Sequence, residues 1–504
     1  MEHFDVLVVG AGISGVGAAY HLKTRCRGAS FAIFEARQSI GGTWDLFRYP
    51  GIRSDSDMYT LGFAFRPWTE SKAIADGPSI LKYLRETVTE HDLASYIRFG
   101  RKVRSAAWDS RTSRWTVDYE EGPERVRRQV TCGFLHMCAG YYNYDAGYRP
   151  RFEGEETFGG LIVHPQFWPE GLDYAGKRVV VIGSGATAVT LVPEIAKTAG
   201  HVTMLQRSPT YVVSRPAEDA FANKLRRWLP SRLAYGIIRW RNVLFGLYFY
   251  NLTRKKPAEA KARIIEMVKA QLGPDYDVQT HFTPTYNPWD QRLCLVPDAD
   301  LFRALKDGSA SVATDRIERF DETGIRLASG ARLDADIIVT ATGLDMQLMS
   351  GLEVSVDGDR IDLPQTFSYK GMMYSGVPNL ASSFGYTNAS WTLKADLTAE
   401  YLCRLVNHMR HRGYTECRPV ADGPIDPTPW LDFSSGYVQR GLSRLPRQGA
   451  ATPWRVHQNY ALDLLAFRFG KLEDGVMRFA RPHAPTQPAR ATPEATSARE
   501  LEDA

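Results

Sequence analysis

Two glycine-rich turns, one near the N-terminus and one in the middle, constrain the fold of this 504-residue chain more than any other feature. The first, Gly10-Ala11-Gly12-Ile13-Ser14-Gly15, follows an apolar run at 4–9 and precedes residues suited to a helix. A second apolar run, 31–35, ends on an acid, Glu35. This order of elements is the dinucleotide-binding fingerprint: a strand, a G-x-G-x-x-G turn, a helix, and a second strand that ends on an acid. In it, the N-terminus of the helix binds the pyrophosphate. We therefore expect FAD or NAD to contact Gly10, Gly12, Ser14, Gly15 and Glu35.

The second glycine-rich turn is a variant of the same fingerprint. Residues 183–188 read Gly-Ser-Gly-Ala-Thr-Ala, after a strand-like run at 178–182, and alanine is accepted at the third glycine position. The next strand, 202–206, is followed by Arg207 rather than by an acid. A carboxylate there would repel a 2′-phosphate, whereas a guanidinium can pair with one. This turn predicts an NADP site; a surface arginine at a strand end is the alternative. The expected contacts are Gly183, Ser184, Gly185, Ala186, Thr187, Ala188, Arg207 and Ser208.

Two such units predict an α/β fold with two Rossmann-like dinucleotide-binding domains. A strand at 134–139 is expected to leave the first domain, and a strand at 335–340 to return to it. The FAD domain would then be discontinuous, with residues 1–150 and 340–480 flanking an NADPH domain at 151–339.

The segment 222–263 differs in character from both units. It holds eleven Lys and Arg and one acid, Glu259, so the rest of the chain carries net negative charge. Its apolar run, 233–250, contains Arg239 and Arg241. Two charged side chains in the centre of a membrane span would carry a high free-energy cost. We expect a helical insertion at about 215–285 with a basic face, forming a pocket wall or a subunit contact in a homo-oligomer. Attachment to a membrane surface is the alternative.

Absent patterns exclude other chemistry. The sequence contains no G-x-S-x-G, H-E-x-x-H or P-loop motif, and its six cysteines show no C-x-x-C spacing. We expect neither a metal site nor a dithiol redox centre. The sequence shows no signal-peptide pattern, and we expect a cytoplasmic protein. A net charge of +5 is too small to indicate nucleic acid. The tail 481–504 has four prolines and no aromatic residue, which is typical of disorder.

Once these other kinds of chemistry are excluded, the chemistry that we expect is hydride transfer from NADPH to flavin, with O2 as the final electron acceptor.

Two further motifs carry a family resemblance. Residues 158–169 fit F-x-G-x-x-x-H-x-x-x-W-P, and residues 41–55 fit G-G-x-W-x-x-x-x-[FY]-P-G-x-x-x-D. Both resemble signatures of type I Baeyer–Villiger monooxygenases. The stretches 286–294 and 385–396 are similar to the ethionamide-activating bacterial members of that family.

The resemblance implies an activity and roles for named residues. Tightly bound FAD, reduced by NADPH, would react with O2 to a C4a-peroxyflavin that oxygenates small apolar ketones to esters or lactones, and also sulfides or thioamides. Arg292 would stabilise the peroxide anion, and Asp55 would orient Arg292; a structural arginine paired with Asp290 is the alternative. Further implied cofactor contacts are Gly42, Thr43, Trp44, Asp45, Leu46, Arg53, Ser54, Asp55, Val103 and Trp391.

Three other functions stay open at this level. An NADPH oxidase-like flavoprotein would release hydrogen peroxide, and a related monooxygenase would act mainly on sulfur and nitrogen. A silent binding module would keep both nucleotide folds without turnover. We also expect His164 to link the domains rather than to catalyse, and Asn388 or Ser390 to cap a helix beginning near Trp391.

Overall fold

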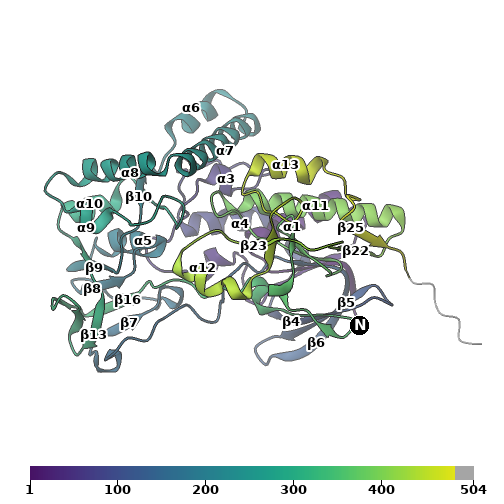
Figure 1. The fold of residues 1–504 in the computed structure, drawn as a ribbon, viewed down its shortest axis with the longest axis horizontal. Coiled ribbons are helices and arrows are strands. Elements are labelled where there is room, and N and C mark those ends of the chain that lie inside the picture. The colour runs from purple at the N-terminus through teal and green to yellow at the C-terminus, as the bar shows by residue number, and fades with distance from the viewer. Residues whose placement is uncertain (483–504) are drawn as a thin grey trace, which may run out of the picture.

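The computed structural model describes residues 1–482, and Figure 1 shows an α/β chain built on two main sheets. The expected disordered tail lies outside the described residues, except for its first two positions. The larger sheet has the strand order β18-β17-β4-β5-β6-β1-β2-β3, with β21 beside β6. Its strands are β1 (His3–Val9), β2 (Phe31–Phe34), β3 (Ile97–Arg98), β4 (Arg101–Asp109), β5 (Arg114–Glu121), β6 (Val126–Met137), β17 (Glu353–Val356), β18 (Asp359–Arg360) and β21 (Leu380–Ser382).

The centre of the larger sheet is parallel, and its helices come from both ends of the chain. Val6 of β1 pairs with Phe31 of β2 on one side and with Phe134 of β6 on the other. Helix α1 (Ile13–Arg25) crosses from β1 to β2 and packs on α11 (Trp391–Arg412). Helices α4 (Gly77–Glu90) and α13 (Tyr460–Phe469) pack against α1 and α11 respectively. The C-terminal part of the chain thus returns to the first glycine-rich turn.

The smaller sheet has five parallel strands in the order β12-β9-β8-β16-β7. They are β7 (Leu161–Val163), β8 (Arg178–Ile182), β9 (His201–Gln206), β12 (Ala310–Thr314) and β16 (Ile337–Thr340), accompanied by α5 (Ala186–Ile195) and α10 (Asp300–Lys306). A three-stranded antiparallel sheet adjoins them: β13 (Ile317–Asp321), β14 (Gly324–Leu327) and β15 (Arg332–Asp334). The α/β class and the two nucleotide-binding sheets agree with the expectation, whereas the domain limits at 150 and 340 stay predictions.

The segment between β9 and β12 carries the expected helices. They are α6 (Ala220–Trp228), α7 (Ser231–Lys255), α8 (Pro257–Leu272) and α9 (Val278–Phe282), enclosed by the paired strands β10 (Val212–Arg215) and β11 (Cys294–Pro297). The expectation of a basic outer face is wrong for the middle of α7, because Arg239 points inward with 6% exposure while Trp240 and Leu244 are exposed. Within residues 1–482, no helix is both long and apolar enough to cross a membrane.

The remaining regular elements are short. Three are helices: α2 (Thr43–Leu46), α3 (Met58–Leu61) and α12 (Gly436–Gly441). Six are strands that pair as β19 (Ser368–Tyr369) with β20 (Met373–Tyr374), β22 (Glu416–Pro419) with β25 (Met477–Ala480), and β23 (Pro427–Pro429) with β24 (Arg447–Gly449).

Candidate active site

The first glycine-rich turn leaves no room for a side chain at Gly10 or Gly15. Gly10 has a φ of +103°, and a Cβ added there would lie 2.7 Å from the carbonyl oxygen of Cys138. A Cβ on Gly15 would lie 1.8 Å from the carbonyl oxygen of Gly10. Gly12 is the N-cap of α1, and no side chain of the described residues caps this helix end. Its first amides therefore remain open to an anion, as a pyrophosphate requires.

The acid at the end of β2 is fixed beside this turn. One carboxylate oxygen of Glu35 accepts a hydrogen bond from the amide of Ala11 at 2.7 Å, and the other accepts one from the amide of Arg37 at 2.9 Å. Glu35 is 7% exposed, and burial raises the pKa of its carboxyl group above the usual range. Arg37 also pairs with Asp45 at 2.7 Å. Glu35 is thus an oriented acceptor at the edge of the turn.

The second glycine-rich turn is more open. Gly183 has a φ of +139°, and an added Cβ would lie 2.4 Å from the carbonyl oxygen of Ala341. Gly185 is the N-cap of α5, and a Cβ added there meets no described atom within 4 Å. Arg207 and Ser208 are exposed after β9, and the structure gives Arg207 no ion pair within residues 1–482. The end of this strand is therefore accessible to a phosphate.

A cavity of about 340 Å³ extends between the two turns. Its wall includes Gly12, Ser14, Gly42, Thr43, Trp44, Arg53, Ser54, Asp55, Ala186, Thr187, Arg292 and Trp391, all of which the sequence predicts as site residues. The wall also contains residues that sequence reasoning missed: Tyr141, Tyr142, Phe384, Thr387, Leu431, Phe433 and Tyr437. The cavity therefore joins the first turn, the N-terminal end of α5 and the segment 384–391.

Arg292 and Asp55 form an ion pair on this wall. The Nε of Arg292 donates to Oδ2 of Asp55 at 3.0 Å, and its Nη2 donates to the same oxygen. Its Nη1 donates to the carbonyl oxygen of Thr387 at 3.3 Å. The negative charge of Asp55 raises the pKa of Arg292 above its usual range, so the guanidinium is a permanent cation. Asp290, the alternative partner, instead accepts a hydrogen bond from Arg254 at 2.8 Å.

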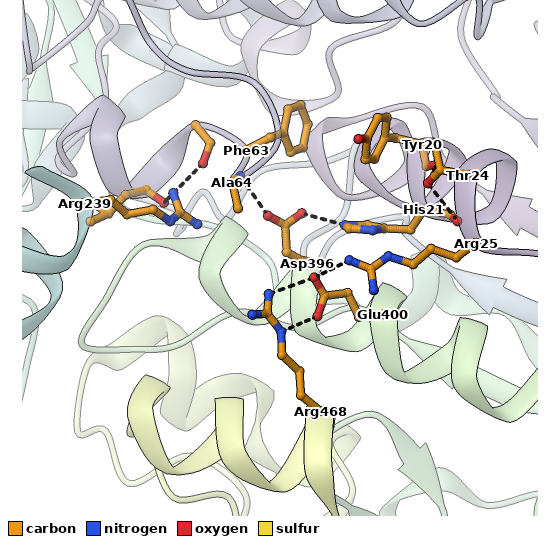
Figure 2. Close-up of polar contacts among 12 residues, drawn as sticks. Tyr20, His21, Thr24, Arg25, Phe63, Ala64, Arg239, Asp396, Glu400 and Arg468 are labelled. Carbon is orange, nitrogen blue, oxygen red and sulfur yellow. Dashed lines mark hydrogen bonds and ion pairs between the residues drawn. The ribbon is translucent and has the colours of Figure 1, made fainter. Parts of the chain in front are cut away.

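The insertion holds the segment that carries Asp55. Two residues after it, Asp57 caps α3 by accepting a hydrogen bond from the amide of Thr60, and Asn242 of α7 donates to Asp57 at 2.9 Å. At the other end of α3, the buried Arg239 donates to the carbonyl oxygens of Tyr59 and Gly62, both at 2.8 Å (Figure 2). Carbonyls at a helix end lack partners within the helix, which explains the inward-pointing arginine.

Buried carboxylates of α11 tie this helix to its neighbours, as Figure 2 shows. Glu400 of α11 accepts hydrogen bonds from Arg25 of α1 at 3.0 Å and from Arg468 of α13 at 2.6 Å and 2.9 Å. Asp396, one turn earlier, lies 3.5 Å from His21 and accepts a hydrogen bond from the amide of Ala64 at 3.3 Å. The N-terminal end of α11 is therefore anchored to α1, α13 and the segment after α3.

Helix α11 begins at Trp391, as expected, but its capping differs from the expectation. Ser390 is at the N-cap position, yet its hydroxyl does not cap the helix and instead lies 2.6 Å from the hydroxyl of Thr60. The indole Nε1 of Trp391 donates to the hydroxyl of Ser14 at 2.8 Å. The start of α11 is thus joined both to α3 and to the first glycine-rich turn.

Other predicted residues lie away from the cavity wall. Val103 is buried in the core of the larger sheet on β4, and Asp45 bonds Arg37 and Ser39. Leu46, Ser184 and Ala188 do not line the cavity either. Arg53 does line it, but its guanidinium forms an ion pair with Asp300 of α10. The cofactor contacts assigned to these residues stay predictions.

His164 directly follows β7 of the smaller sheet and is not on the cavity wall. Its Nδ1 accepts a hydrogen bond from the amide of Gln166 at 3.2 Å. A Cβ added to Gly147 would lie 2.0 Å from the His164 ring, so that ring packs directly on the connecting segment. Burial lowers the pKa of His164, which keeps the imidazole neutral near pH 7. The predicted linking role is compatible with this position and remains a prediction.

The missed wall residues differ in how visible they are in the sequence. Tyr141 and Tyr142 directly follow Gly140, a few residues after β6 ends at Met137, and this tyrosine cluster is a usable signal. Phe433 lies in the irregular segment before α12 and Tyr437 in the short helix α12 itself, and neither is part of a periodic pattern. Burial raises the pKa values of Tyr141 and Tyr437, so both phenols are neutral. The wall beside Arg292 is thus mainly aromatic.

Two family models match this chain. Residues 8–76 match an NAD(P)-binding Rossmann-like domain, and residues 69–242 match the flavin-binding monooxygenase-like family. The FAD-containing monooxygenase EthA of Mycobacterium tuberculosis is 55% identical over 488 residues, which cover 96% of this chain and 99% of EthA. The probable FAD-binding monooxygenase AlmA of Acinetobacter baylyi is 48% identical over 481 residues, covering 95% and 96% of the two chains.

Solved structures extend the comparison to the fold. An oxidised steroid monooxygenase bound to NADP is 26% identical, with a TM-score of 0.72 and coverage of 95% of this chain and 100% of that chain. The open crystal structure of cyclohexanone monooxygenase has a TM-score of 0.74 with the same coverage, at 20% identity. The latter similarity is one of fold alone.

Proposed function

The chain belongs to the FAD-containing flavin monooxygenases, and on that premise we propose that it uses FAD, NADPH and O2 to insert oxygen into small apolar ketones. This is the Baeyer–Villiger reaction, which gives esters or lactones, and we extend the proposal to sulfides and thioamides. One observation carries it: the Arg292–Asp55 ion pair lies on the wall of a cavity that reaches both glycine-rich turns.

The described residues fit FAD at the first turn. Glycine at positions 10 and 15 allows a turn too tight for side chains there, the uncapped start of α1 offers amides to a pyrophosphate, and Glu35 is oriented to accept ribose hydroxyls. Gly12 and Ser14 of this turn also line the cavity, and Trp391 donates a hydrogen bond to Ser14 there. Reduced FAD supplies the two electrons with which O2 is activated.

The second turn fits NADPH. Gly185 and Ala186 are exposed at the start of α5, where a helix N-terminus favours an anion. Arg207 is placed after β9 to pair with a 2′-phosphate, which NADH lacks. Because Ala186 and Thr187 lie on the cavity wall, the nicotinamide would extend from this turn toward Arg292.

Arg292 would stabilise negative charge on the activated oxygen before it attacks a carbonyl carbon. Its guanidinium stays charged at every working pH, and Asp55 together with the carbonyl of Thr387 sets its orientation. Such preorganised charges act strongly where water is excluded. The aromatic wall from Tyr141, Phe433 and Tyr437 provides that exclusion and suits apolar substrates.

The test is turnover by the FAD-loaded protein with a panel of ketones, sulfides and thioamides. We expect NADPH-dependent products one oxygen atom heavier than the substrate, with ester or lactone products from ketones and little hydrogen peroxide. Substrate-independent peroxide release with no oxygenated product would instead identify an NADPH oxidase. Oxygenation of sulfides and amines alone would contradict the ketone part of the proposal.

A further inference from the structure

Helix α7 exposes a stripe of apolar residues on its outward side. Leu233, Ile237, Trp240, Leu244 and Tyr248 follow one another at helical spacing, and their exposures range from 42% to 65%. The inward side is also largely apolar, and it carries the buried arginine that binds the end of α3. A helix that covers a core normally has polar residues on its outward side, so this stripe is available to a partner.

Two neighbouring helices extend the stripe. Helix α6 packs on α7, and the ring of Trp240 lies 5.8 Å from that of Tyr460 at the start of α13. Figure 1 shows α6, α7 and α13 along the same upper side of the molecule. We call the exposed apolar residues of the three helices the docking face: Phe221, Trp228, Leu233, Ile237, Trp240, Leu244, Phe245, Tyr248, Leu462, Leu465 and Phe469. Most of the exposed large hydrophobic residues among positions 1–482 belong to it.

The exposed charged residues on the helices of the docking face have one sign. Lys224, Arg227, Arg232 and Lys255 are exposed on α6 and α7. Neither of these helices contains an acid, and the single acid of α13, Asp463, is buried against Lys394. A second copy of the chain would bring like charges together, whereas an anionic surface would neutralise them.

We propose that the docking face binds the surface of an anionic phospholipid bilayer without crossing it. Exposed aliphatic residues with Trp and Tyr suit the boundary between acyl chains and headgroups, and the four cations suit anionic headgroups. Since α7 also holds the segment carrying Asp55, binding would place the cavity close to the bilayer, where apolar substrates concentrate. Binding itself does not depend on the oxygenation chemistry.

The test is flotation of the full-length, FAD-loaded protein with vesicles. Vesicles of phosphatidylcholine mixed with an equal share of phosphatidylglycerol should carry the protein, and vesicles of phosphatidylcholine alone should not. Replacing Lys224, Arg227 and Arg232 by Gln should weaken binding about fivefold per charge. Leu244→Glu should abolish it, because a carboxylate would enter the acyl boundary.

Matched controls lie on the side of the smaller sheet. Leu161→Glu changes a leucine that is 43% exposed, against 57% for Leu244, and a triple Gln variant of Lys177, Lys306 and Arg326 removes three exposed cations. Both controls should bind like the parent, with FAD content reporting that every variant is folded. Failure of the parent to float, or equal binding by Leu244→Glu, overturns the proposal. A parent oligomer that Leu244→Glu converts to a monomer, without vesicle binding by the parent, would show a self-interface instead.

Discussion

The turn at 10–15 follows β1 of the larger sheet and is closely packed at its third glycine, whereas the turn at 183–188 follows β8, the central strand of the smaller sheet, and is open at Gly185. A Cβ at Gly15 would lie 1.8 Å from a backbone oxygen, but Ala188 at the matching position accommodates its own Cβ while fully buried. A Cβ at Gly12 would meet Gly42 at 3.5 Å, and one at Gly185 meets nothing within 4 Å. In the proposed function, the closed turn suits a resident cofactor and the open turn suits one that exchanges at each cycle.

The largest effect in this comparison is expected from alanine at the two turns. Gly15→Ala forces helix α1 away from β1, because the obstructing atom is backbone, and should cost about 3 kcal/mol or more of unfolding free energy together with FAD. Gly185→Ala has open space and an ordinary φ of −80°, so thermal stability and FAD content should match the parent. Thermal unfolding and flavin absorbance measure both. Equal losses in the two variants would remove the distinction between a closed and an open turn.

Replacing Arg292 tests whether the cofactors expected at the two turns take part in one reaction. Arg292→Ala should lower the rate of ketone oxygenation by about 100- to 1000-fold, because a fixed charge at the reacting oxygen is lost. FAD content should be unchanged, since neither turn is altered, and NADPH oxidation should release hydrogen peroxide instead.

Arg292→Lys is the matched control for this prediction. It keeps the charge but loses the planar fork that bonds Asp55, so partial activity at most is expected. Product mass and a peroxide assay distinguish the outcomes. Ketone turnover by Arg292→Ala near the parent rate would exclude Arg292 from the reacting site.

Replacing Glu35 tests whether the turn at 10–15 binds FAD and the turn at 183–188 does not. Glu35→Ala removes the acceptor expected for the ribose hydroxyls and also the partner of the Ala11 amide, so the Kd for FAD should rise about 10- to 100-fold. Flavin loss on dilution, followed by fluorescence, measures this change. The KM for NADPH should be unaffected in protein reconstituted with excess FAD. A variant that retains FAD like the parent would contradict the assignment.

Arg207 gives the smallest expected effect, because it is exposed to solvent. Arg207→Ala should raise the KM for NADPH about tenfold, through loss of a charge-assisted contact to the 2′-phosphate, and leave the KM for NADH nearly unchanged. Steady-state kinetics with both nucleotides separate the two effects. An equal rise for both would mean that Arg207 has a structural role and that the phosphate site lies elsewhere.

Local patterns predicted more of the fold than of the site. Strand β8 and the start of α11 lie where the sequence places them, because apolar runs and turn residues act over a few neighbouring positions. Ser390 is the N-cap residue of α11, as one of the two predicted candidates, but its hydroxyl contacts Thr60, which is distant in the chain, instead of bonding the helix amides. Phe433 and Tyr437 were missed because an irregular segment and a six-residue helix carry no periodic pattern.

The sequence by itself determined the two nucleotide-binding turns, the α/β class and the helical nature of the insertion, because glycine geometry, helix starts and strand runs are local properties. Only the tertiary structure decided which distant groups meet. Asp55 and Arg292 are 237 residues apart, and their hydrogen bonds form because the segment before α3 and the segment before β11 both border one cavity. The direction of α7 was decided in the same way: its arginine turns inward because the carbonyls at the end of α3 need donors, and Tyr235, Ile238 and Val243 are buried on the same side. The apolar residues on the opposite side of α7 face out.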